Sequence, residues 1–372
     1  MNDSLVFTGH GLRHSGGIER YLLALVGNLH QRGIRPTVVA HRFDTRLPEY
    51  GWVEPLRVRT SVLGGALRDW WFDRCLRRLK ARHGFYPVIA LSQTAAADIA
   101  ICGGTHPGYL AAIDKTASWQ DRLAIALERR HFQGAAMVIA HSRLMAEQVQ
   151  QFYGVPGERL RLLYPPVDTQ RFCPVSDSQR RVLRERLGLP LDRAVFLLAS
   201  TGHARKGLDL LVRALGHADL PVLLVVAGRP VDVQAPNLRY LGYRSDMEDV
   251  YRAVDGTVMA SRFEPFGLVG VESVLCGTPL IGALGMGCME VLQGDAVLPF
   301  DLQVDAAQAG GLDAAINTAL TRWRAGQFRV VDPRAALCYD PSVAAHVEVL
   351  LGWVNRLRAA RQRQTETAAS GA

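Results

Sequence analysis

Two glutamates with seven residues between them carry the clearest chemical signal in this sequence. They are the ends of the stretch Glu264-Pro-Phe-Gly-Leu-Val-Gly-Val-Glu272. The apolar run Gly256–Ala260 before them predicts a strand, and we expect a helix to begin near Leu268. The first amides of such a helix attract anions, and Glu264 would face the same point, with Glu272 about one turn into the helix. The stretch therefore predicts a binding site for a negatively charged ligand that carries hydroxyl groups.

The tripeptide Arg205-Lys206-Gly207 supplies positive charge in the same half of the chain. It lies between a predicted strand, Val195–Ala199, and a predicted helix, Leu208–Leu215. A basic helix start on the surface is the alternative interpretation, but cations there oppose the helix dipole and cost roughly a few tenths of a kcal/mol each. A guanidinium and an ammonium together suit a departing diphosphate, whose negative charge grows as its bond breaks. We therefore assign Arg205 and Lys206 to an anionic leaving group.

Two glycine-rich loops in the first half of the chain are further candidates. Gly16 and Gly17 precede the predicted helix Ile18–Arg32, and their lack of side chains lets a ligand approach the backbone. Such pairs are common in turns, so this signal is weak alone. His106 lies in the second loop, Cys102–Tyr109, where it either contacts a ligand or caps a turn.

Taken together, these motifs resemble those of the retaining nucleotide-sugar glycosyltransferases of the GT-B fold with a Glu-x7-Glu signature, including bacterial lipopolysaccharide-core sugar transferases. The Gly-Gly-x-Glu-Arg sequence at Gly16–Arg20 belongs to the same resemblance. The resemblance implies a catalytic set of Glu264, Arg205, Lys206 and His106. The implied acceptor-side residues are His14, Glu19 and Arg20. The implied donor-binding residues are Gly16, Gly17, Arg205, Lys206, Phe266, Gly267, Leu268 and Glu272, with Glu272 holding the ribose hydroxyls.

Strand-like apolar runs alternate with amphipathic helical ones along the chain, which is typical of parallel α/β sheets. Two prolines in Leu163–Asp168 fix an extended connector between two such halves. The resemblance implies two Rossmann-like domains facing across a cleft, with a C-terminal helix that crosses back to the first. We expect domains at 1–165 and 166–340, a crossover helix at 341–361 and a frayed tail at 362–372. The other predicted strands are Leu5–Phe7, Pro36–Ala40, Val88–Leu91, Met137–Ala140, Leu160–Leu163, Val222–Ala227, Leu238–Leu241 and Leu280–Gly282.

The composition restricts the class of protein. A chain of 372 residues, of which 48% are hydrophobic, suits two globular domains. No apolar run is long enough to span a bilayer and the N-terminal sequence lacks a signal-peptide pattern, which predicts a cytoplasmic protein. The cysteines are scattered and no Asp-x-Asp is present, so we expect neither a disulfide framework nor a metal site. We expect no cofactor beyond the nucleotide-sugar substrate.

The net charge of +8 arises entirely from the part of the chain before Pro165. Positive charge is concentrated in Arg57–Arg82, beside Trp70, Trp71 and Phe72. This segment is either a solvated helix face or a surface for an anionic partner, and the aromatic residues favour a membrane interface. We expect no nucleic acid partner, because the charge is not part of a known nucleic-acid-binding module. Peripheral contact at the inner face of the inner membrane follows as an expectation.

The function that these patterns favour is a retaining, metal-independent transfer of a hexose-type sugar from a nucleoside-diphosphate sugar to a saccharide acceptor. The basic first half favours an anionic glycolipid or oligosaccharide, such as a lipopolysaccharide core or another lipid-linked glycan. A non-catalytic nucleotide-sugar-binding protein and a nucleotide-sugar epimerase of the same fold remain alternatives. A dinucleotide-dependent dehydrogenase is disfavoured, because His14 stands where the Gly-x-Gly-x-x-Gly fingerprint begun by Gly9 and Gly11 needs glycine.

Overall fold

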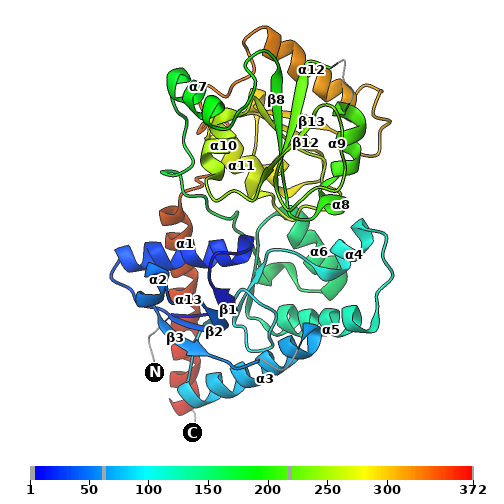
Figure 1. The fold of residues 1–372 in the computed structure, drawn as a ribbon. Helices are drawn as coiled ribbons and strands as arrows, with labels where there is room; N and C mark the ends of the chain where they lie inside the picture. The colour runs from blue at the N-terminus through cyan, green and yellow to red at the C-terminus, as the bar shows by residue number, and fades with distance from the viewer. Residues whose placement is uncertain (1–4, 61–63, 217–219, 371–372) are drawn as a thin grey trace. The chain divides into compact units, whose positions relative to one another are not determined.

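A computed structural model describes residues 5–60, 64–216 and 220–370 of the protein, which divides into two compact α/β units. Unit 1 comprises the chain up to residue 111 together with residues 115–166 and the segment from residue 340 on. Unit 2 comprises residues 112–114 and 167–339. Figure 1 shows each unit as a sheet with helices packed around it. The predicted fold class, an α/β protein with two Rossmann-like sheets, is confirmed.

Unit 1 contains a seven-stranded parallel sheet in the order β3-β2-β1-β4-β5-β6-β7. The chain builds outward from β1 in one direction and, from β4 onward, in the other. The sheet therefore has a switch point between β1 and β4, where loops leave in opposite directions. Its strands are β1 (Val6–Leu12), β2 (Thr37–Phe43), β3 (Glu54–Arg57), β4 (Val88–Ala90), β5 (Ile99–Cys102), β6 (Met137–Ala140) and β7 (Leu160–Leu162).

Helices of unit 1 cover this sheet and enclose its apolar side chains. The buried cluster that contains Phe7, Leu25 and Ile139 joins β1, the first helix and β6 in one core. The helices are α1 (Gly17–Gln31), α2 (Pro48–Gly51), α3 (Gly65–His83), α4 (His106–Ala112), α5 (Trp119–Gly134), α6 (Arg143–Tyr153) and α13 (Val343–Ser370), with a short 3-10 turn at Gly157–Arg159.

Helix α13 comes from the end of the chain and is part of the core of unit 1 (Figure 1). Val347, Leu350 and Val354 are buried in the same cluster as α1 and β1. The Nε2 atom of His346 lies 2.7 Å from the Tyr21 hydroxyl of α1. Arg32 at the end of α1 forms a 2.7 Å ion pair with Glu348. The predicted return of the C-terminal helix to the first domain is therefore confirmed.

Unit 2 contains a six-stranded parallel sheet in the order β10-β9-β8-β11-β12-β13. Its switch point lies between β8 and β11. The strands are β8 (Ala194–Ser200), β9 (Val222–Gly228), β10 (Leu238–Gly242), β11 (Gly256–Met259), β12 (Leu280–Ala283) and β13 (Val297–Phe300). The helices are α7 (Asp177–Arg186), α8 (His203–Lys206), α9 (Leu208–Leu215), α10 (Met247–Ala253), α11 (Leu268–Leu275) and α12 (Leu312–Arg324), with 3-10 turns at Gly287–Glu290 and Gly294–Ala296.

Five strands differ from the sequence prediction by more than one residue or were not predicted. β2 runs to Phe43, three residues beyond the predicted end at Ala40. β1 continues to Leu12, because Gly9 and Gly11 pair with β2 inside the sheet instead of forming a loop. The strands β3, β5 and β13 were not predicted. β5 is only four residues long, and β3 and β13 each contain a proline, which argues against a central strand. Both are edge strands, where a residue without an N–H is tolerated.

The C-terminal segment also differs from the expectation. We expected residues 362–372 to be a frayed tail, but α13 runs through Ser370. The segment contains no glycine or proline before position 371, so nothing in the sequence ends the helix earlier. Across the described parts of the chain, no helix combines the length and the apolar character needed to cross a membrane.

Substitution of Gly228 tests how closely β8 and β9 approach. Its φ of +136° disfavours any other residue, and a Cβ atom there would lie 1.9 Å from the Ser200 carbonyl oxygen. We expect Gly228→Ala to lower the free energy of unfolding by about 3 kcal/mol in urea titrations. Gly202→Ala is the control, because a Cβ atom at Gly202 meets nothing within 4 Å. Equal stability of the two variants would contradict this packing.

Candidate active site

The residues with the strongest chemical signal lie at the switch point of unit 2. β8 and β11 are neighbours in the sheet, and the loops Ser200–Gly207 and Ala260–Gly267 leave their carboxyl ends. The N–H of Arg262 donates a 2.9 Å hydrogen bond to the carbonyl of Arg205, which ties the two loops together. Ligands of open parallel sheets bind at this position, because the loops diverge there and leave room.

Glu264 joins the two basic residues that follow β8. Its carboxylate accepts hydrogen bonds from the Lys206 ammonium and from Arg205 Nη1, the latter at 3.1 Å. Arg205 Nη1 also donates to the Phe263 carbonyl at 2.6 Å. The side chains of Lys206 and Glu264 are only 9% and 12% exposed. Charges this buried require partners, and the two side chains are each other's partners.

The protonation state of Glu264 follows from these contacts. Burial alone would raise the pKa of this carboxyl group, but Lys206 and then Arg205 outweigh burial and hold the pKa below its usual value. Glu264 is therefore ionised at neutral pH. Two cations and one carboxylate leave the cluster with one net positive charge, which favours a further anion.

Two glycines allow the loops to approach this closely. Gly207 has a φ of +71°, and a Cβ atom there would lie 2.2 Å from the Ala260 carbonyl oxygen. Gly267 has a φ of +93°, and its Cβ atom would lie 2.9 Å from Cγ of Glu264. Both positions therefore require glycine, which explains the glycines in the two motifs.

Helix α11 begins directly after the Glu264 loop. Gly267 is its N-cap residue and has no side chain to cover the first-turn amides of Leu268 and its neighbours. The loop itself is fixed by the segment after β12, since the N–H of Gly287 donates to the Glu264 carbonyl at 3.2 Å. The N–H of Cys288 donates to the Phe266 carbonyl at 2.6 Å. The N-terminus of α11 thus follows Glu264, a member of the positively charged cluster, by only four residues.

Glu272 lies inside α11 and is 4% exposed. Its Oε2 accepts a 2.9 Å hydrogen bond from the hydroxyl of Tyr251, which lies on α10. The sequence analysis did not identify Tyr251. Its only signal was an aromatic residue in an amphipathic helix, which is equally typical of a core position.

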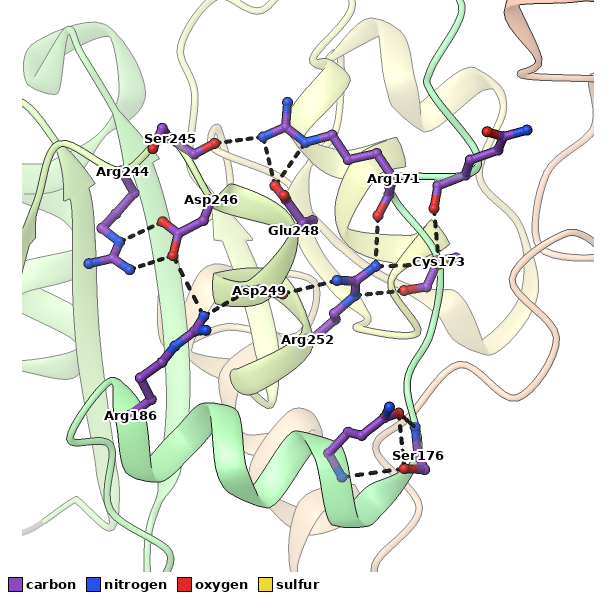
Figure 2. A network of polar contacts seen from close by, with 12 residues as sticks. Arg171, Cys173, Ser176, Arg186, Arg244, Ser245, Asp246, Glu248, Asp249 and Arg252 are labelled. Atoms are coloured by element: carbon purple, nitrogen blue, oxygen red, sulfur yellow. Dashed lines mark hydrogen bonds and ion pairs between the residues drawn. The ribbon is translucent and has the colours of Figure 1, made fainter.

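Salt bridges attach α10, the helix that carries Tyr251, to neighbouring segments, and Figure 2 shows their acidic residues Glu248 and Asp249. Arg171, from the segment before α7, binds Glu248 at 2.7 Å, and Arg252 pairs with Asp249 at 2.9 Å within α10 itself. Arg186 of α7 reaches the same Asp249 at 2.6 Å. Because Arg171 and Arg186 attach α10 to two other segments, the Tyr251 hydroxyl has a defined position for Glu272.

The predicted glycine pair lies in unit 1 at the start of α1. Gly16 is the N-cap residue and accepts a 3.2 Å hydrogen bond from the N–H of Arg20. A Cβ atom at Gly17 would meet nothing within 4 Å, so packing inside the protein does not require glycine there. His14 is exposed in the preceding loop, and Glu19 is half-buried in the first turn.

His106 begins α4, in the loop region after β5. Its ring Nε2 lies 2.9 Å from Asp121 Oδ1, and its backbone N–H donates to Glu128 Oε2 at 2.9 Å. The same region lies against α1, because a Cβ atom at Gly103 would be 3.1 Å from the Ile18 side chain. The structure therefore brings the loop of His106 close to the start of α1.

Asp121 and Glu128 were not among the predicted site residues. They lie two turns apart on α5 and both bind His106, one at the ring and one at the backbone. Ser118, then His106, hold the pKa of Asp121 below its usual range, whereas burial raises the pKa of Glu128 despite its hydrogen bond from Tyr153. The signal available in the sequence was the capping box at Ser118 and Asp121 followed by an acid seven residues on.

The predicted residues thus fall into two groups. Unit 2 brings together Arg205, Lys206 and Glu264, and places Phe266, Gly267, Leu268 and Glu272 on the segment that follows. Unit 1 holds His14, Gly16, Gly17, Glu19, Arg20 and His106.

Comparisons with known proteins agree with this architecture. Residues 15–171 match the family model of Glycosyltransferase Family 4, and residues 193–321 match Glycosyl transferases group 1. The solved structure of WaaG, a glycosyltransferase involved in lipopolysaccharide biosynthesis, has a TM-score of 0.75 at 17% identity and covers 87% of this chain and 92% of its own. Anabaena HepE in complex with UDP and glucose has a TM-score of 0.65 at 20% identity and covers 99% of both chains. The two units are those of a GT-B fold.

Sequence relatives show to which family of GT-B proteins the chain belongs. A probable transglycosylase of Burkholderia thailandensis is 45% identical over 345 residues, which cover 92% of this chain and 94% of the relative. A D-inositol 3-phosphate glycosyltransferase of Acidothermus cellulolyticus is 27% identical and covers 83% of this chain and 80% of its own. This chain belongs to the group 1 glycosyltransferases.

The ionised state of Glu264 gives a testable pH dependence. A carboxyl group whose pKa is lowered by folding contributes stability above its ordinary value of 4.5, and that stability is lost as the pH falls. We expect the free energy of unfolding of the wild type to drop between about pH 5 and pH 3, and that of Glu264→Gln to change less over this range. At neutral pH the variant should be about 3 kcal/mol less stable, because Lys206 loses its carboxylate.

Glu348→Gln is the matched control for this experiment. It removes an exposed carboxylate that pairs with Arg32, and exposed pairs contribute about 1 kcal/mol or less. Urea titrations at several pH values measure all three proteins. Parallel pH curves for the wild type and Glu264→Gln would contradict the role of the buried cluster.

Proposed function

We propose that this protein is a retaining, metal-independent hexosyltransferase that uses a nucleoside-diphosphate sugar. The observation that carries the proposal is the cluster of Arg205, Lys206 and Glu264 at the switch point of unit 2. The cluster has net positive charge, and Glu264 immediately precedes the first turn of α11. Glu272 lies further along that helix. In this arrangement Arg205 and Lys206 would bind a diphosphate, Glu264 a sugar and Glu272 a ribose.

The cations have a direct part in the proposed reaction. The bond between the anomeric carbon and the diphosphate oxygen breaks, and its electron pair leaves with the nucleoside diphosphate. Arg205, Lys206 and the α11 amides stabilise that charge without a metal ion. The acceptor hydroxyl oxygen then bonds to the anomeric carbon on the face that the leaving group vacates. Its proton goes to a phosphate oxygen of the leaving group.

Glu264 has two roles in this proposal. Before the donor binds, its carboxylate holds the side chains of Arg205 and Lys206 in position. When the diphosphate arrives it competes for the same two cations, so the carboxylate becomes available to the hydroxyls of the transferred sugar. Glu272 accepts the ribose hydroxyls while Tyr251 fixes its orientation.

The distribution of charge and one structural neighbour support the choice of acceptor. Unit 1 carries the excess positive charge, and its residues His14, Glu19, Arg20 and His106 are proposed to serve the acceptor and the transferred sugar. WaaG is involved in lipopolysaccharide biosynthesis. We therefore propose an anionic saccharide acceptor, a lipopolysaccharide core or another lipid-linked glycan.

Binding of nucleotides in EDTA tests the donor site. We expect one of UDP, GDP and ADP, but not the monophosphate CMP, to raise the melting temperature of the wild type, and calorimetry to give its dissociation constant. Lys206→Met should weaken binding about tenfold to a hundredfold, because a charged hydrogen bond to phosphate contributes about 1.5–3 kcal/mol. Glu272→Ala should weaken it similarly through the ribose.

Glu264→Gln separates the two roles of that residue. The substitution removes the carboxylate that competes for the cations, so the nucleoside diphosphate should bind as tightly as in the wild type or several-fold more tightly. Sugar transfer should nevertheless fall. Weaker binding of the bare nucleotide to this variant would contradict the proposed competition.

Transfer itself is tested with the sugar of the nucleotide that binds and purified truncated lipopolysaccharide cores as acceptors. We expect the anomeric configuration of the donor to be kept in the product, as read from the proton coupling at the anomeric carbon by NMR. An inverted product would contradict retention. Donor binding without transfer to any saccharide would favour the non-catalytic nucleotide-sugar-binding protein.

A further inference from the structure

Helix α3 presents one continuous exposed stripe. Its members are spaced by four, three, four and four residues, which places them on one face of a helix, within an arc of about 80° and over a length of about 22 Å. All of them are exposed, whereas Phe72 and Leu76 on the opposite face are buried in the core of unit 1. The stripe consists of Leu67, Trp71, Arg74, Arg78 and Arg82.

The three arginines of the stripe have no acidic partner among the residues that the structure describes. The two acids of α3 lie elsewhere on the helix and are already used. Asp69 pairs with Arg68 at 3.0 Å, and Asp73 pairs with Arg77 at 3.0 Å. The stripe therefore carries uncompensated positive charge, which favours an anionic surface.

The N-terminal end of the stripe is apolar. Leu67 is 53% exposed and Trp71 is 42% exposed. The indole N–H of Trp71 already donates to the Arg59 carbonyl at 3.2 Å, so the exposed part of the ring is apolar. A merely solvated helix face gains nothing from two large apolar side chains, whereas an interface between water and lipid does.

Two of the three aromatic residues that suggested a membrane contact do not take part. Phe72 is buried under α3. Trp70 is half-buried, donates its N–H to the Leu123 carbonyl at 3.1 Å and lies under the guanidinium of Arg130. The surface is thus defined by helical periodicity, and only Trp71 of the Trp-Trp-Phe sequence belongs to it.

We propose that this stripe of α3 docks unit 1 on an anionic phospholipid bilayer. Leu67 and Trp71 enter the interfacial region, and Arg74, Arg78 and Arg82 lie along the lipid phosphates. The complementarity is specific to a lipid surface, because it combines unpaired guanidinium groups with an adjoining apolar end on one face. The proposal does not depend on the sugar-transfer reaction.

Cosedimentation of the purified full chain with vesicles tests this surface. We expect binding to vesicles of phosphatidylcholine and phosphatidylglycerol and little binding to phosphatidylcholine alone. The variant R74Q/R78Q/R82Q should bind about a hundredfold more weakly, because each basic residue near the surface contributes about 1 kcal/mol. Trp71→Ala should reduce the binding that persists at high salt, because that part is apolar.

The matched control is R181Q/R324Q/R334Q, which removes three exposed arginines from unit 2. It should bind as the wild type does, and unchanged melting temperatures should show that all variants are folded. Equal losses in both triple variants would overturn the proposal, since binding would then reflect net charge alone. Full binding by the α3 variant, or tighter binding of this face to a DNA duplex than to the vesicles, would also overturn it.

Discussion

A buried carboxylate is the constraint on which the arrangement of unit 2 depends. Glu264 is ionised in a place with little water, and such a charge persists only with cations beside it. Arg205 and Lys206 meet this need because β8 and β11 are adjacent and their loops close over two glycines, Gly207 and Gly267. The ionic cluster therefore depends on both the order of the strands and the positions of the glycines.

Much of this was predictable because the signals are local. The alternating strands and helices follow from the apolar periodicity of the sequence. Two cations just before a helix are unfavourable unless an anion pairs with them. The sequence analysis did not anticipate that the anion is Glu264 itself. That contact joins residues 58 positions apart, and it depends on which strands become neighbours, which periodicity does not reveal.

The residues that sequence reasoning missed act through others. Tyr251 orients Glu272, and Asp121 and Glu128 hold His106. Asp121 belongs to a capping box, which indicates a helix start and not a site, and Tyr251 and Glu128 have the ordinary spacing of core or surface residues in a helix. Residue type alone was also misleading for Trp70 and Phe72, which suggested a membrane-binding surface. Their positions around the helix bury Phe72 and half-bury Trp70.

Helix α13 has a consequence for the synthesis of the protein. The core of unit 1 needs Val347, Leu350 and Val354, yet the ribosome makes them after all of residues 167–339. At typical rates of elongation, about 180 residues take roughly 10–40 s, during which the apolar side chains of α1 lack their contacts with α13. Unit 2 can close its own core within that time. The half of the chain that is made first is therefore completed last.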